Sequence, residues 1–248
     1  MEAKIHGLKL FRNSLYKVAA KSLQEKHPQY IETLIRTLGD TGNPFQALDA
    51  AKTIPTDVGF AKWRPLLTTT LDTELAINQL KVTLELLRLT PSKGLLIPEG
   101  TEGTLVFYYI HTWVFWTDAL LERARKLIKK AVRALVRPNN TNWQSIEDEV
   151  SKPINELSKE LREKMRNPLA HGGGAGVSAP AEKRLWEGLT IIAVVTNQYE
   201  LSINQMLGSM AKYHIKWYES LDKKSVLVLD KIDRAIGKLN EHTLWDKI

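Results

Sequence analysis

Apolar residues recur every three or four positions along almost the whole chain, and no segment alternates apolar and polar residues as a β-strand would. This spacing predicts one helix over Leu8–Ala19, a second that begins near Tyr30 and ends at Gly39, and another over Leu71–Leu87. Prolines act as breakers in the looser stretch that precedes this last helix, and they are Pro44, Pro55 and Pro65. The chain is therefore predicted to be all-α.

A segment rich in proline and glycine interrupts this pattern near the middle of the chain. It reads TPSKGLLIPEGTEG, from Thr90 to Gly103, and such residues end helices and favour turns. We divide the chain there into an N-terminal helical region with its linker, residues 1–103, and a helical domain, residues 104–248.

The second part of the chain predicts three long helices, over residues 105–136, 153–166 and 178–220. Ser151 is expected to cap the middle helix at its N-terminus, and Pro153 is expected to lie in its first turn. Helices of this length, each with one apolar face, predict a helical bundle.

The amino-acid composition limits the cellular compartment in which we expect this bundle. The 248 residues include no cysteine, which excludes disulfides and thiolate metal sites and favours a reducing compartment. The N-terminus, MEAKIHGLKLF, lacks the apolar core of a signal peptide. The most apolar stretch, residues 105–121, contains His111 and Asp118 and is shorter than the ~20 residues that a membrane span needs. We expect a cytoplasmic protein without a membrane partner.

A basic stripe is the first candidate surface for function. The net charge of +7 permits a polyanionic partner, and five cations share one narrow face in, and directly after, the helix over about residues 105–136: Arg123, Lys126, Lys130, Arg133 and Arg137. The opposite face is apolar and consists of Leu120, Ala124, Leu127, Ile128, Ala131 and Leu135. The stripe fits either a solvated face above a core or a ridge that contacts nucleic-acid phosphates.

A second stripe on the same helix carries His111, Asp118, Glu122 and Arg125, beside many aromatic residues. Polar groups in such surroundings are partly buried and need partners. A structural hydrogen bond between His111 and Asp118 is one interpretation. The other is that these residues orient a neighbouring site.

The stretch LREKMRNPLAHGGGAG, residues 161–176, is the strongest candidate site. Asn167 precedes a proline, which disfavours helical backbone angles, so the helix is expected to end near Arg166 and to leave Arg166 and His171 about one turn apart. An ordinary helix C-terminus has the same composition. As a site, the histidine can transfer a proton at neutral pH, and the guanidinium can hold a phosphate and the charge that builds on it in a transition state.

The segment Arg166-Asn167-Pro168-Leu169-Ala170-His171 resembles the signature of the HEPN superfamily, in which four to six residues separate an arginine from a histidine. The resemblance covers about residues 105–220. It implies an all-α bundle that forms a homodimer, with two copies of the motif in one cleft, and a metal-independent endoribonuclease activity on RNA without a cofactor. His171 would transfer the proton, Arg166 would bind the phosphate and Asn167 would position the substrate.

The resemblance also implies a further polar residue on the first helix of the domain, and His111, Asp118 and Glu122 are all candidates. Such proteins act in phage defence, as toxins or in RNA processing, with antitoxins or other defence proteins as partners. One subgroup pairs with a nucleotidyltransferase antitoxin and has a tyrosine two positions after the histidine. Gly173 stands there in this chain, so we do not assign the chain to that subgroup.

Other classes of protein fit less well. The sequence HGGG is also found in the oxyanion holes of some esterases, but the required Gly-x-Ser-x-Gly nucleophile motif is absent. The glycines are not followed by the Lys-Ser/Thr pair of a phosphate-binding loop, and the six histidines show no paired spacing of metal ligands. The remaining alternative is a non-catalytic HEPN-like module that binds RNA, a nucleotide or a protein partner.

Overall fold

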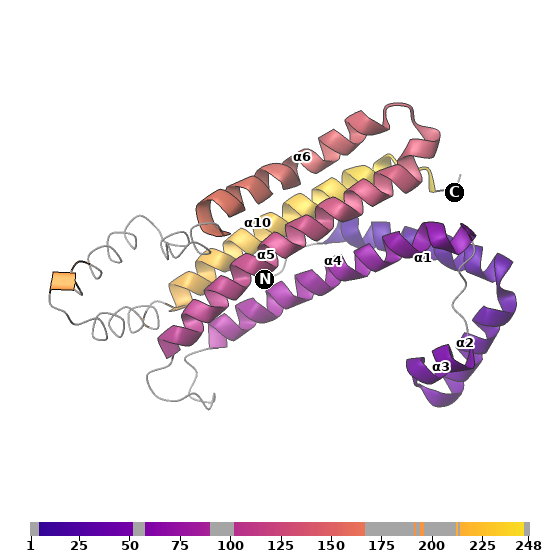
Figure 1. The fold of residues 1–248 in the computed structure, drawn as a ribbon, viewed down its shortest axis with the longest axis horizontal. Helices are drawn as coiled ribbons and strands as arrows, with labels where there is room; N and C mark the ends of the chain where they lie inside the picture. Colours follow the sequence, from indigo (N-terminus) through magenta and orange to yellow (C-terminus); the bar gives the residue numbers. More distant parts are fainter. Residues whose placement is uncertain are drawn as a thin grey trace.

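The computed structural model describes residues 5–51, 58–89, 102–166 and 214–245, together with the single positions 191, 194, 195 and 212. These residues contain no β-strand, which confirms the all-α class. Four long helices, α4 (Val58–Leu89), α5 (Glu102–Ala131), α6 (Trp143–Leu161) and α10 (His214–Glu241), run side by side, as Figure 1 shows.

The N-terminal helices pack at one end of this bundle (Figure 1). Helix α1 (His6–Lys26) contacts α10 and α4, and α2 (Pro28–Thr41) pairs with the short α3 (Pro44–Ala50). Gly7 lets α1 approach α10 closely, since a Cβ added there would lie 2.5 Å from the backbone oxygen of Asp233. The backbone N–H of Leu8 donates to the Asp233 carboxylate at 3.0 Å and fixes the same contact.

One hydrophobic core joins these helices. It includes Leu8 of α1, Leu80 of α4, Leu127 of α5, Ile154 of α6 and Ile232 of α10, each almost fully buried. Helices from both sides of the predicted boundary between residues 103 and 104 therefore share one core. Whether the two regions have separate roles stays a prediction.

Three further helical turns adjoin the long helices and carry residues singled out by the sequence. Helix α5 continues into a π-helical turn, η1 (Val132–Val136), and a 3-10 turn, η2 (Arg137–Asn139). Helix α6 continues into a π-helical turn, η3 (Arg162–Arg166). Helical structure thus reaches Val136 and Arg166, as the apolar pattern predicts. Isolated π-helical turns often occur at functional sites.

The structure corrects several predicted boundaries. Pro65 lies inside α4 and Pro153 inside α6, so neither breaks its helix. Helix α6 begins at Trp143, and Ser151 is buried within it and is not its N-cap. Helix α2 continues past Gly39 and ends at Thr41, and it is capped by Gly42, whose φ of 62° is left-handed and suits glycine.

The predicted helix over residues 178–220 lies mostly outside the described residues. Its expected end near residue 220 is wrong, because α10 passes through that position and continues to Glu241. Within the described part of the chain, none of the helices has the length and apolar character that crossing a bilayer would require.

Candidate active site

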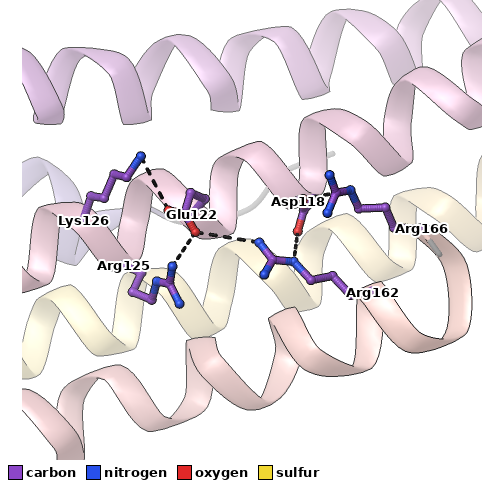
Figure 2. A network of polar contacts seen from close by, with 6 residues as sticks. All are labelled: Asp118, Glu122, Arg125, Lys126, Arg162 and Arg166. Atoms are coloured by element: carbon purple, nitrogen blue, oxygen red, sulfur yellow. Dashed lines mark hydrogen bonds and ion pairs between the residues drawn. The ribbon is translucent and has the colours of Figure 1, made fainter. Parts of the chain in front are cut away.

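The candidate site lies where α5 faces η3. Helix α5 carries Asp118 and Glu122 four residues apart, and η3 carries Arg162 and Arg166, also four residues apart. Residues at this spacing share one face of a helix, so each element presents a pair of charges. Figure 2 shows the two acidic side chains turned toward the two arginines.

The carboxylate of Asp118 accepts a hydrogen bond from Arg162 and forms an ion pair with Arg166. The Nε of Arg162 lies 2.8 Å from its Oδ1, and the Nε of Arg166 lies 3.2 Å from its Oδ2 (Figure 2). The Nη2 of Arg162 also reaches Glu122 at 3.7 Å. Asp118 therefore fixes two guanidinium groups next to each other.

Glu122 extends this network along α5. Its carboxylate pairs with Arg125 at 2.7 Å and with Lys126 at 3.5 Å. The network thus contains four cationic side chains and two carboxylates, which leaves a local excess of two positive charges (Figure 2). Such an excess favours an anionic ligand.

The two kinds of group in the network differ in burial. The side chain of Asp118 is 11% exposed, whereas those of Arg162 and Arg166 are 36% and 39% exposed. The hydrogen bond to Asp118 raises the pKa of Arg162, so its guanidinium stays charged. Each guanidinium has five N–H donors, and Asp118 contacts only the Nε of each. The arrangement can bind an anion from solvent while its anchoring carboxylate stays covered.

Of the three motif residues, the structure describes only Arg166. It brings Arg166 to Asp118, which the sequence had singled out separately. Asn167 and His171 lie outside the described residues.

His111 lies two turns before Asp118 on α5, and the structure describes no hydrogen bond between them. The ring of His111 packs on Phe107 with their centroids 4.0 Å apart, and its buried Nε2 has no hydrogen-bond partner among the described residues. Burial lowers its pKa, which keeps the imidazole neutral at neutral pH. Asp118 is already occupied by the arginines, so the interpretation of a His111–Asp118 hydrogen bond is wrong.

The predicted basic stripe lies on α5, η1 and η2, and the predicted apolar face behind it is fully buried. Several of its cations have local partners. Lys126 pairs with Glu122, and Lys130 donates to the hydroxyl of Thr69 on α4 at 2.8 Å. The other cation contacts are with aromatic rings, Arg123 with Trp116 and Arg137 with Trp143. Arg133 is exposed.

The sequence-based prediction missed Arg162. The sequence could have indicated it, because Arg162 lies four residues before Arg166, the same spacing that separates Asp118 from Glu122 on α5. Lys224 of α10 was also missed, and its Nζ lies 4.0 Å from the sulfur of Met165, next to Arg166 in the chain. Burial lowers the pKa of Lys224.

In the described part of the chain, no group of three or more His, Cys, Asp or Glu side chains gathers as metal ligands would. No family model, curated protein or solved structure matches this chain.

Proposed function

We propose that this protein is a metal-independent endoribonuclease of the HEPN type that acts as a homodimer, in phage defence or as a toxin. One observation carries the proposal: Asp118 holds the guanidinium groups of Arg162 and Arg166 side by side, and both stay more than a third exposed. This pair occurs at the arginine of the motif that resembles the HEPN signature.

A fixed guanidinium pair suits phosphoryl transfer from RNA. When the 2′-hydroxyl of RNA attacks the neighbouring phosphate, negative charge builds on the phosphate oxygens in the transition state. Donors that are held in place before the reaction stabilise that charge better than mobile ones. Arg166 is proposed as the phosphate ligand, Arg162 as the second guanidinium beside it, and Asp118 as the residue that positions both.

His171 is proposed to transfer the proton and Asn167 to position the substrate. Only four residues separate Arg166 from His171, so their Cα atoms lie within about 18 Å of each other whatever path the chain takes. A histidine has the pKa needed for proton transfer near neutral pH. In the proposed homodimer, the two copies of the segment Arg166–His171 meet at the interface, because one motif alone is a sparse active site.

A second function has support from the same contacts. The ion pairs of Asp118 with two arginines also connect η3, at the end of α6, to α5. A non-catalytic module would need only this structural role of the contacts. Such a module would bind RNA, a nucleotide or a protein partner through the local positive charge and would release no product.

An RNA cleavage assay with EDTA present separates the two functions. The wild type should cleave a labelled RNA and leave DNA of the same sequence intact. His171→Ala should reduce the rate at least about 100-fold, the contribution typical of a general acid–base residue. His242→Ala is the matched control, because His242 is an exposed histidine on the C-terminal turn.

Arg166→Lys tests the phosphate ligand in the same assay. Lysine keeps the charge but lacks the forked donors of the guanidinium, so the rate should stay well below that of the wild type. Arg234→Lys, at an exposed arginine of α10, should leave the rate unchanged. RNA binding without cleavage by the wild type would favour the non-catalytic module instead.

A further inference from the structure

A second group of cationic side chains lies on the other side of η3 from Arg162 and Arg166. It consists of Lys164 on η3 and of Lys224 and Lys231 on α10, and it is termed the lysine cluster. Lys224 and Lys231 are seven residues apart, which is about two helical turns, so they share one face of α10. Helix α10 packs along α6, which continues into η3 (Figure 1). The end of α6 therefore has cations on both flanks.

One carboxylate, that of Glu160 on α6, lies near all three ammonium groups. The Nζ of Lys164 donates to its Oε1 at 2.9 Å, from four residues further along the same helical face. The hydrogen bond and charge of Lys164 lower the pKa of Glu160, and the charges of Lys231 and Lys224 lower it further. Three ammonium groups and one carboxylate leave a local excess of two positive charges. The network around Asp118 has the same excess.

Lys224 is the cluster member whose charge is compensated least. Its Nζ contacts the sulfur of Met165 at 4.0 Å, and it forms no ion pair with a carboxylate among the described residues. A thioether sulfur is a weak acceptor. Lys224 is an exposed residue, but its ammonium group is partly desolvated, which lowers its pKa. A phosphate from solvent would supply the counter-charge that the protein does not provide.

We propose that the lysine cluster binds backbone phosphates of the same RNA strand whose cleaved phosphate lies at Arg166. This inference rests on the proposed function, since it takes RNA as the ligand. Two separate excesses of positive charge, one toward α5 and one toward α10, fit a polyanion better than a single small anion. The ammonium group of lysine is a point charge without forked donors, which suits contact with phosphates irrespective of base sequence.

RNA binding by a double variant, Lys224→Gln with Lys231→Gln, tests this surface. The probe is a fluorescently labelled oligonucleotide of 2′-O-methyl RNA, which lacks the attacking hydroxyl, so that binding is measured without cleavage. Loss of two phosphate contacts should weaken binding about tenfold at low salt and lower the salt dependence of log K by about 1.4. Lys9→Gln with Lys17→Gln, at exposed positions of α1, removes the same charge and should have a much smaller effect. Equal binding by the two double variants overturns the proposal.

Glu160→Gln tests the same surface in the opposite direction, because a gain in affinity cannot result from a failure to fold. The substitution removes the one carboxylate that offsets the three lysines. Binding of the 2′-O-methyl RNA should tighten by about two- to fivefold, the range that one exposed charge contributes. Glu25→Gln removes an exposed carboxylate from α1 and is the matched control. A Glu160→Gln variant that binds no more tightly than the control contradicts the proposal.

Cleavage of natural RNA by the same proteins separates this inference from the proposed function. The Lys224 and Lys231 double variant should raise KM more than it lowers kcat, because the cluster holds the strand away from the cleaved phosphate. Cleavage by the wild type, with control-like RNA binding by the double variant, overturns the lysine cluster and leaves the nuclease. The predicted binding losses without any cleavage by the wild type support the lysine cluster and contradict the nuclease. A wild type that binds no RNA overturns both.

Discussion

Two groups of cationic side chains differ in their partners: the arginine pair of η3 that faces α5, and the basic stripe on α5, η1 and η2. Arg162 and Arg166 share the carboxylate of Asp118, which is itself covered. The stripe from Arg123 to Arg137 is held by weaker partners, such as the carboxylate of Glu122, the hydroxyl of Thr69 and two tryptophan rings.

This difference bears on what each group can do. A guanidinium fixed by a buried carboxylate presents its remaining donors in one direction, which suits a single phosphate in a reaction. Lys126 and Lys130 are exposed and each has one polar partner, so they contribute charge more than geometry, which suits contact with a nucleic-acid backbone. In the proposed function, Arg162 and Arg166 would therefore serve the chemistry, and the stripe would serve general affinity for RNA.

Asp118→Asn removes the negative charge that Arg162 and Arg166 share, and we expect it to have the largest effect on stability. The amide keeps the size of the side chain but leaves Arg162 and Arg166 without a shared counter-charge. We expect a loss of about 2 kcal/mol in the free energy of unfolding, at the lower end for hydrogen bonds to charged groups because the arginines keep contact with water.

Denaturant unfolding measures that loss. Glu156→Gln removes an exposed carboxylate from α6 and should change the free energy of unfolding by less than about 0.5 kcal/mol. Equal effects of the two substitutions would mean that Asp118 does not hold the arginines in solution.

Neutralising the stripe tests whether its cations contribute to RNA binding. Changing Lys126, Lys130 and Arg133 together to glutamine should weaken RNA binding about tenfold at low salt and lower the salt dependence of log K by about 2, if each cation neutralises one phosphate. The matched control changes three exposed lysines of α1 to glutamine, namely Lys9, Lys17 and Lys21, which alters the net charge equally. Binding that responds to both triple variants alike would assign the effect to net charge and not to the stripe.

Replacement of His111 should have the smallest effect on stability. Unlike the cations above, His111 has a buried ring nitrogen with no hydrogen-bond partner among the described residues. Burial lowers its pKa below the ordinary value of 6.5, so below about that pH the unfolded chain binds more protons than the folded chain. The wild type should therefore lose stability on acidification from pH 7 to pH 5. His111→Phe should remove part of that loss, because phenylalanine does not titrate. Thermal unfolding at a series of pH values measures the difference, and parallel curves for the two proteins would contradict a buried neutral His111.

The apolar pattern predicted the helices well because burial of one face decides where most of them form. The prolines did not mark helix ends reliably, because burial of one face also outweighs the cost of a proline inside a helix. In α6 the buried residues Ile146, Val150, Ile154, Leu157 and Leu161 keep one face continuous across Pro153. A proline inside a helix costs about 3 kcal/mol. Burial of several large apolar side chains, each worth about 1.5–3 kcal/mol, exceeds that cost.

The candidate site was predicted in part. The sequence singled out Arg166, Asp118 and Glu122, but it gave no indication that Arg166 and Asp118 meet, because 47 positions separate them and the contact depends on how α5 packs against η3. Arg162 was missed because a charged residue near a helix end usually faces solvent.

The chemical end group of the 5′ cleavage fragment tests the central claim most directly. Attack by the RNA's own 2′-hydroxyl leaves a 2′,3′-cyclic phosphate on that fragment, and mass spectrometry of the products distinguishes it from other ends. We expect the cyclic phosphate from the wild type with EDTA present, and its loss in His171→Ala while helix content is retained. A plain 3′-hydroxyl end, or cleavage that depends on an added metal ion, would contradict the proposed mechanism even if the protein cleaves RNA.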